Sequence, residues 1–306
     1  MATAERAVSA TEERAIGGEF PRPVEHPHVH WYTAVYIIWY RDLVRYSRDR
    51  ARLVASFAQP VLYLAIFGVG LSSALGSGFS AGTGKAGHSI KYIQFMYPGV
   101  VSMAVLFIAV FSAMSIVWDR EFGFLKEILI APVGRGWVAV GKALGGATQA
   151  MIQGTIFLIL APFVGVKLTV LSVVEVIPLL FILAFALTTL GVAVAARLQS
   201  MQGFQMMMNF ILMPMFFLSG SLFPLSSPKL PGFIAVLSRI DPVAYGVAPI
   251  RAVLLGNSGL PAPAVTQLTA LTVGGWQIPT LMDTGILCLF GLLMLGVSMR
   301  TFSRRG

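Results

Sequence analysis

The sequence predicts an all-α, polytopic membrane protein with six transmembrane helices. Hydrophobic residues make up 56% of the chain and charged residues only 11%, whereas an ordinary soluble domain has about 25% charged residues. The mean hydropathy is +0.79, and six runs are long enough to cross a bilayer, which takes about 20 mostly apolar residues. This composition argues against a soluble globular enzyme and excludes an intrinsically disordered chain.

The six predicted spans contain only two charged residues, Glu175 and Asp283. The spans cover about Leu53–Leu75, Tyr97–Trp118, Ala143–Val166, Val173–Ala196, Phe204–Phe223 and Leu281–Met299. Several prolines lie in or at the ends of these runs, but neighbouring helices can satisfy the backbone groups that a proline frees.

The N-terminal region is expected to stay outside the bilayer. Residues 1–30 form a polar cytoplasmic tail with five glutamates and no apolar run, so we see no cleavable signal peptide. Residues 31–52 predict an amphipathic interface helix, because aromatic residues lie opposite a row of arginines spaced 4, 3 and 4 apart. That row is Arg41, Arg45, Arg48 and Arg52. The helix could be a simple topology anchor or also a docking surface for a cytoplasmic partner, and the two are compatible.

Basic residues in the loops predict the orientation. With the N-terminus inside, sixteen Lys and Arg residues are cytoplasmic and six are external, as the positive-inside rule requires. Both termini, including the tail at 301–306, are then cytoplasmic. The net charge of +9 is explained by arginines beside anionic lipid, and we expect no nucleic-acid partner.

No motif for covalent chemistry or cofactor binding is found. The sequence Gly136–Ala143 imitates a phosphate-binding loop but has Ala where Ser or Thr must reach magnesium. The one G-x-S-x-G pattern, Gly78–Gly82, lies in a glycine-rich segment expected to be an external loop, whereas a nucleophile needs a strand-to-helix turn. There is no H-E-x-x-H motif, and Cys288 is the only cysteine. His26, His28 and His30 alternate, but Pro27 interrupts them and no Asp or Cys lies beside them, so we expect no metal site.

The membrane interior is expected to be apolar. No carboxylate falls near the middle of a predicted span, which disfavours an ion-coupled carrier. The fifth span is rich in methionine, a residue that lines adaptable apolar surfaces, although packing is the simpler explanation for any single one. The candidate residues for a translocation path are Met207, Met208, Phe210, Met213 and Phe216.

Two connecting segments have distinctive patterns. The first, Trp118–Arg135, is a loop long enough for two helical turns, and Pro132 and Gly134 are the signals that end this short helix. Phe122, Leu125 and Leu129 share one face of it. The second, at 223–256, is too polar and too rich in proline to span the membrane, yet too apolar for an exposed loop. Short helices that re-enter the outer leaflet fit this second pattern.

Together these segments resemble the type-2 permease family, the membrane subunits of ABC exporters. The first resembles the family's R-E-x-G-x-L-E-x-L-x-x-x-P-x-x-R coupling helix, here at about 119–132. The second resembles its external P-L-S…L-P…N-P-x-x-Y…R-x-x-L-L-G hairpin, here at about 223–256, with Asp241 in place of the commoner Asn. The Gln59-Pro60 pair after the arginine-rich helix also fits. The resemblance covers roughly residues 31–300, with the permease domain at 53–300, and is nearest to the daunorubicin-resistance and nodulation-factor exporter permeases.

The resemblance implies partners and site residues. It implies two permeases, as two copies or with a sister chain, and two separate ABC ATPase subunits that bind the ATP and Mg. The chain itself would then have no catalytic site, and Arg120, Glu121 and Glu127 would transmit force from the ATPase. The implied coupling surface is Arg120, Glu121, Phe122, Gly123, Leu125, Glu127 and Pro132, with Arg41, Arg45 and Arg48. The implied hairpin residues are Pro224, Pro231, Asp241, Pro242, Tyr245 and Arg251.

The function expected from the sequence is export across the plasma or inner membrane. The apolar fifth span favours a hydrophobic or amphipathic substrate, such as a drug, lipid or glycolipid. A permease for polysaccharide or lipid-linked glycan is the main alternative. An ion-coupled efflux carrier and a non-transporting membrane scaffold also remain open.

Overall fold

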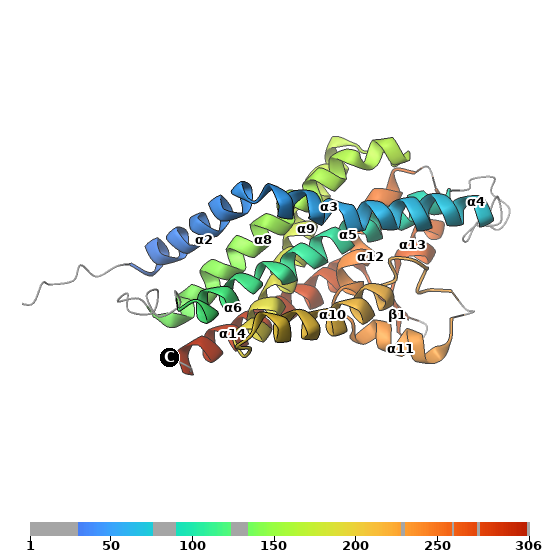
Figure 1. Ribbon diagram of the computed structural model, residues 1–306. Coiled ribbons are helices and arrows are strands. Elements are labelled where there is room, and N and C mark those ends of the chain that lie inside the picture. Colours follow the sequence, from blue (N-terminus) through green and yellow to red (C-terminus); the bar gives the residue numbers. More distant parts are fainter. Residues whose placement is uncertain are drawn as a thin grey trace, which may run out of the picture.

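The computed structural model describes residues 30–75, 90–123, 134–227, 230–258, 260–273 and 276–304. These residues form an elongated helical bundle (Figure 1). Six of the described helices are long and apolar enough to cross a membrane, so the prediction of an all-α polytopic protein with six spans is confirmed.

The described elements follow one another along the chain in three groups. The first group is α2 (Trp31–Arg48), α3 (Arg50–Tyr63), the π-helical η1 (Leu64–Leu71) and α4 (Ser72–Leu75). The next are α5 (Tyr92–Ser112), α6 (Met114–Glu121), α8 (Arg135–Leu160) and the 3₁₀-helical η3 (Ala161–Val164). The last are α9 (Val170–Ala195), α10 (Met201–Leu218), α11 (Gly232–Ile240), α12 (Ala244–Gly256), α13 (Ala262–Thr269) and α14 (Thr280–Arg304). A small antiparallel ribbon pairs β1 (Thr272–Val273) with β2 (Trp276–Gln277) before α14.

Two spans are longer than the sequence predicted. The second continues from Tyr92 to Glu121 and the third from Arg135 to Val164, each 30 residues, whereas about 20 residues cross the hydrocarbon. Hydropathy marks only the apolar part of a helix, so the predicted spans missed the polar turns that extend it. Asp119, expected in a loop, therefore lies in α6, and Lys142, expected at a helix end, lies two turns inside α8.

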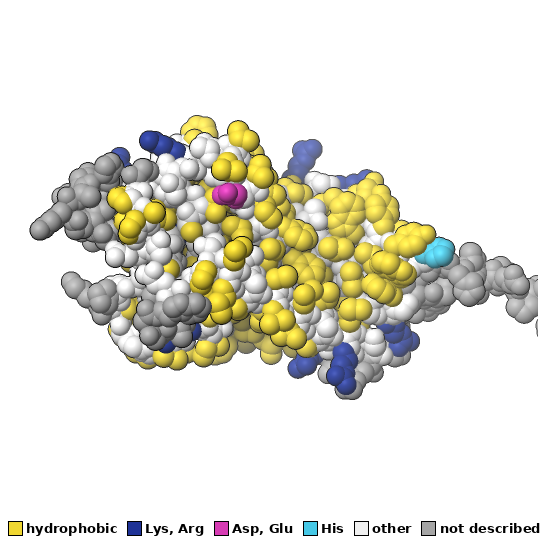
Figure 2. All heavy atoms as spheres, turned by 180° about the vertical axis from the view of Figure 1, so that it is seen from behind, with side chains coloured by type: hydrophobic (Ala, Val, Ile, Leu, Met, Phe, Trp, Pro, Cys, Tyr) yellow, Lys and Arg dark blue, Asp and Glu magenta, His cyan; other side chains and the backbone are white. Residues whose placement is uncertain are grey.

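Helix α5 lies at the centre of the bundle. Most of its residues are buried, and it packs against α8, α9 and α12, while α14 packs along α9. The outer surfaces of the other spans remain apolar, and Figure 2 shows mainly hydrophobic side chains across the middle of one face. A continuous apolar outer surface of this kind is expected where a protein faces lipid.

Helix α2 packs beside the first half of α8. The rings of Trp31 and Trp137 stack with centroids 4.6 Å apart, and a Cβ at Gly141 would lie 2.9 Å from Cβ of Ile38. Gly141 and Gly145 thus allow the close packing that their spacing predicts, and α2 is the helix that uses it. The predicted 31–52 helix is interrupted at Asp49, after which α3 leads into the first span.

The bundle has two chemically different ends. We call one the α2 end, where α2, the end of α6, the start of α8 and the C-terminal end of α14 gather (Figure 1). The other is the hairpin end, formed by α11, α12 and α13. There α11 and α12 meet at a 93° bend, inside the segment predicted to be a re-entrant hairpin; its depth in the membrane stays a prediction.

Candidate functional site

A cluster of charged side chains joins three helices at the α2 end. Nζ of Lys142 on α8 lies 2.9 Å from Oδ2 of Asp119 on α6 and 3.2 Å from Oδ1 of Asp42 on α2. Arg41 Nη2 donates to the same Asp119 oxygen at 2.9 Å, and Arg45 Nη1 lies 3.8 Å from the other oxygen. We call these five residues the charge cluster.

The core of the charge cluster is buried. Lys142, Asp42 and Asp119 are each at most 5% exposed, whereas Arg41 and Arg45 have side chains that are 41% and 49% exposed. A buried charge is tolerated only when it is paired and hydrogen-bonded, and Lys142 also donates to Ser115 Oγ at 3.0 Å. Removing one partner of such a pair costs about 3–5 kcal/mol. The cluster therefore holds α2, α6 and α8 in one arrangement.

The next two residues of α6 bind the connection between α9 and α10. The Arg120 guanidinium donates to the backbone carbonyls of Ala195, Ala196 and Leu198, at the C-terminal end of α9. Oε2 of Glu121 accepts from the backbone N–H of Met201, the first residue of α10. A cation at a helix C-terminus and an anion at a helix N-terminus both complement the helix dipole. Arg120 and Glu121 thus connect α6 to two further spans.

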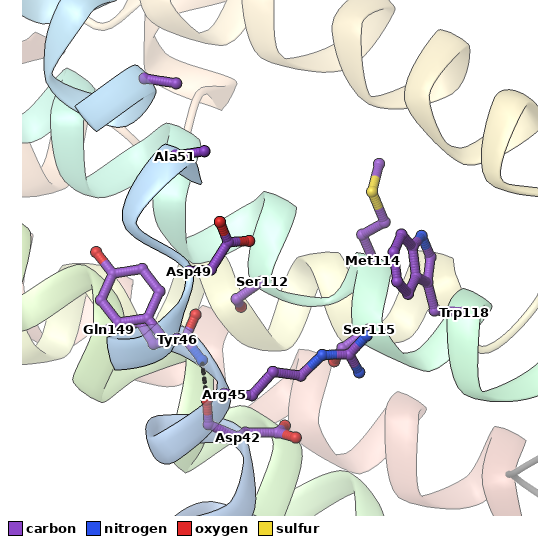
Figure 3. Close-up of a pocket in the computed structure, with 11 residues that line it drawn as sticks. Asp42, Arg45, Tyr46, Asp49, Ala51, Ser112, Met114, Ser115, Trp118 and Gln149 are labelled. Atoms are coloured by element: carbon purple, nitrogen blue, oxygen red, sulfur yellow. Dashed lines mark hydrogen bonds between the residues drawn. The ribbon is translucent and has the colours of Figure 1, made fainter. Parts of the chain in front are cut away.

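A cavity lies next to the charge cluster (Figure 3). It has a volume of about 470 Å³ and lies between α2, α3, α5, α6 and α8. In Figure 3, Tyr46, Asp49 and Gln149 lie on one side, and Met114 and Trp118 lie on the other. The Arg45 side chain extends toward Trp118, and its guanidinium lies 5.0 Å from the ring centroid.

The structure places the predicted coupling residues in different settings. Arg41 and Arg45 belong to the charge cluster, and Arg48 is exposed. Phe122 is exposed, and Gly123 ends α6 with φ of +80°, a left-handed conformation that favours glycine. Leu125, Glu127 and Pro132 lie outside the described residues.

The candidate path residues on α10 fall on two faces. Met208 and Phe216 are buried in the core of this chain, at 0% and 1% exposed, so they pack against other helices. Met207, Phe210 and Met213 are exposed, with Phe210 at 81%. Only this second group lies on the outer face of α10, where a substrate, lipid or second permease could contact it.

The predicted hairpin residues include a buried arginine and two residues that make hydrogen bonds at the bend. Arg251 on α12 donates to the carbonyls of Gly220 and Ser221, and its guanidinium lies 4.2 Å from the ring centroid of Phe95. Asp241 Oδ1 accepts from the Val243 N–H, and the Tyr245 hydroxyl donates to the Arg239 carbonyl. These contacts fix the bend between α11 and α12. Pro224 and Pro231 lie before α11, and Pro242 lies within the bend.

A sequence model described as ABC-2 type transporter matches residues 33–255. This chain belongs to the ABC-2 type transporter family. The match covers α2, the charge cluster, the first five spans and the α11–α12 bend. An ABC-2 type transporter is a multi-pass membrane transport protein, so the recognition of the family from the loop at 118–135 and the segment at 223–256 is confirmed.

Several curated proteins are similar to this ABC-2 type transporter. The inner membrane transport permease YadH of Escherichia coli (strain K12) is 27% identical over 248 residues, 80% of this chain and 91% of YadH. Nodulation protein J of Rhizobium meliloti is 27% identical over 223 residues, 72% of this chain and 80% of that protein. The putative transport permease ycf38 of Cyanophora paradoxa is 24% identical over 246 residues, 78% of this chain and 80% of its own length.

Sequence reasoning missed the buried part of the charge cluster. It placed Asp42 on a surface helix and treated Lys142 as an anchor. Two signals were present in the sequence. Asp42 is four residues after the buried Ile38 and four before the buried Tyr46, so all three lie on one face of the helix. Lys142 lies between the small residues Gly141 and Ala143, where a closely packed neighbour can cover it. The partners could not be paired, because Asp42 and Lys142 are 100 positions apart in the sequence, which leaves their distance in space undetermined.

Proposed function

We propose that this ABC-2 type transporter is the permease subunit of an ATP-driven exporter in a plasma or inner membrane. Two permeases, as two copies of this chain or this chain with a sister chain, would associate with two copies of a separate ATPase subunit that binds ATP and Mg. Family membership supports the ATPase partnership. The name of YadH, an inner membrane transport permease, supports the location. Both termini would be cytoplasmic.

The observation that carries this proposal is the set of contacts at the α2 end. The predicted coupling segment begins at Asp119, inside the charge cluster, and continues through Arg120 and Glu121 into a loop. A partner that moves this loop would move α2 and α8 through Asp119, and α9 and α10 through Arg120 and Glu121. Because buried ion pairs resist separation, these helices would shift together. This arrangement suits the transmission of force.

The substrate we propose is hydrophobic or amphipathic, such as a drug, lipid or glycolipid. The exposed face of α10 carries Met207, Phe210 and Met213 and no charge, which gives an apolar substrate an adaptable surface. The name of the similar nodulation protein J gives no substrate. A glycan or lipid-linked glycan permease remains the alternative.

The first test is purification of the tagged chain from membranes in mild detergent, followed by an ATPase assay on the eluate. We expect a phosphate-loop ATPase to co-purify in equal amount. If the chain purifies alone and still exports in membranes without ATP, the exporter proposal is wrong and an ion-coupled carrier takes its place.

The second test reverses one charge in the coupling segment. Glu121→Arg places a cation at the positive N-terminal end of α10, so we expect ATP hydrolysis to continue without transport and membrane insertion to be normal. Glu121→Gln keeps an acceptor for the Met201 N–H and is the matched control, with export close to wild type. Normal export by Glu121→Arg contradicts the coupling role.

A further inference from the structure

The cavity at the α2 end is formed by two interruptions in the helices around it. Helix α2 stops at Arg48 and α3 starts at Arg50, and Asp49 at this break lines the cavity. Helix α5 stops at Ser112 and α6 starts at Met114, and both of these residues line it from the other side. Continuous helices would pack side by side and close this space. The two breaks therefore keep a cavity of about 470 Å³ open beside the charge cluster.

One buried group in the wall of the cavity lacks a hydrogen-bond donor. Gln149 on α8 is 5% exposed, and its Nε2 donates to the Asp42 carbonyl at 3.3 Å, the dashed line in Figure 3. Its Oε1 accepts no hydrogen bond from any described residue. A buried acceptor without a donor costs about 1–3 kcal/mol, so this position favours an occupant with an O–H or N–H group.

Two charged side chains in the wall of the cavity already have partners in the protein. Asp42 pairs with Lys142, and Arg45 Nη1 lies 3.8 Å from Oδ1 of Asp119. A cationic or anionic occupant would bring a further charge into a partly buried site, where an unpaired charge is costly. A neutral occupant with several hydroxyl groups would not. The Trp118 ring and the methyl and thioether groups of Ala55 and Met114 provide an apolar wall for the rest of the molecule.

We infer that this cavity binds the neutral, hydroxyl-rich head group of an amphipathic molecule, with Gln149 Oε1 accepting a hydroxyl proton. The inference rests on the proposed function, because it makes the cavity a binding site for the transported molecule at the α2 end. The acyl or alkyl part of the molecule extends along Met114 and Ala55, and its head group lies against Gln149 and Asp49. Gln149 is then a specificity residue for hydroxylated head groups.

The test uses the full chain purified in lipid nanodiscs and a dodecyl glucoside with a photoreactive diazirine in its alkyl chain. Labelled peptides are mapped by mass spectrometry. Dodecyl maltoside, dodecylphosphocholine and dodecyltrimethylammonium then compete at equal concentrations. We expect labels on α3 and α6 around the cavity. We also expect the maltoside to compete about tenfold better than either charged detergent, a difference comparable to one or two hydrogen bonds.

Three variants test the site residues. Gln149→Leu removes the acceptor and should weaken labelling about fivefold, the value of one hydrogen bond. Ala55→Phe fills the cavity without removing a polar group and should abolish labelling, which covers the case that Gln149→Leu does not fold. Gln267→Leu changes an exposed glutamine on α13 at the hairpin end and is the matched control, with labelling as in the wild type.

Several results would overturn the inference. Labelling unchanged in both Gln149→Leu and Ala55→Phe means that the cavity holds only water. Equal or better competition by a charged detergent refutes the neutral head group. Co-purification of the ATPase is read separately: labelling without an ATPase partner refutes the exporter alone, and an ATPase partner without labelling refutes the binding site alone.

Discussion

At the α2 end, the buried cation Lys142 lies between two carboxylates that come from two other helices. At the hairpin end, the buried cation Arg251 lies on the Phe95 ring and donates to two backbone carbonyls, with no carboxylate among its hydrogen-bond partners in the described residues. The buried acids there, Asp241 and Asp283, each keep one oxygen that no described donor reaches. The α2 end thus pairs opposite charges between helices, whereas the hairpin end satisfies its buried cation with neutral carbonyls and an aromatic ring.

This difference has a mechanical consequence. Ion pairs between helices transmit movement from one helix to another, because separating them leaves buried charges unpaired. At the hairpin end, Arg251 joins α12 to the turn after α10 through neutral carbonyls, so breaking these bonds leaves only one buried charge without a partner. In the proposed exporter, the α2 end would therefore be the part that transmits force between helices.

Replacing Lys142 should have the largest effect on stability. Lys142→Met leaves Asp42 and Asp119 close together with only the half-exposed arginines as partners, so we expect a loss of about 3–5 kcal/mol. Protein abundance in membranes and thermal unfolding in mild detergent measure this. Lys167→Met, at an exposed lysine, is the control and should behave as wild type. A Lys142→Met protein as stable as the wild type would refute the role of the charge cluster.

Replacing Arg251 should have the next largest effect. Arg251→Met loses two hydrogen bonds from a charged donor and the contact with Phe95, so we expect a loss of about 2–4 kcal/mol. Arg251→Lys keeps the charge but cannot reproduce the planar guanidinium on the ring, so its loss should be intermediate. Thermal unfolding of the three proteins gives the order. An Arg251→Lys protein as stable as the wild type would show that the guanidinium geometry is unimportant.

Replacing Arg120, which caps the C-terminal end of α9, should reduce stability less than replacing Arg251. Its main effect should be on the connection between α9 and α10. Arg120→Gln removes a cation from the C-terminal carbonyls of α9, for an expected loss of about 1–2 kcal/mol. Hydrogen exchange should increase at the connection between α9 and α10 and stay unchanged in α12. Increased exchange throughout the bundle would mean that Arg120 acts on global stability and is not a local connection.

Replacing Asp241 should have the smallest effect. Asp241→Asn keeps an oxygen for the Val243 N–H and removes a buried carboxylate that lacks a second partner, so we expect unchanged or slightly higher thermal stability. Asp241→Ala loses the hydrogen bond as well and should cost about 1 kcal/mol. A clear loss in the Asn variant would show that the charge of Asp241 is needed.

The sequence predicted the architecture because hydrophobic runs and loop motifs are local signals. Six spans, the helix from Trp31 and the bend near Pro242 all follow from patterns within about thirty residues. The charge cluster does not, since Asp42, Asp119 and Lys142 come together only after α2 packs on Gly141. The split of the α10 residues into buried Met208 and exposed Met207 likewise depends on which face of the helix meets α5. Apolar composition alone does not decide that.

The exporter proposal requires that an ATPase contacts the α2 end. A photo-crosslinking amino acid at Phe122, exposed at the end of α6, tests it directly, with the same amino acid at the exposed Phe163 of η3 as the control. We expect Phe122 to crosslink to a nucleotide-binding subunit, with a yield that changes when ATP is added, and Phe163 not to crosslink to it. A crosslink to that subunit from Phe163, or from neither position, would contradict the claim.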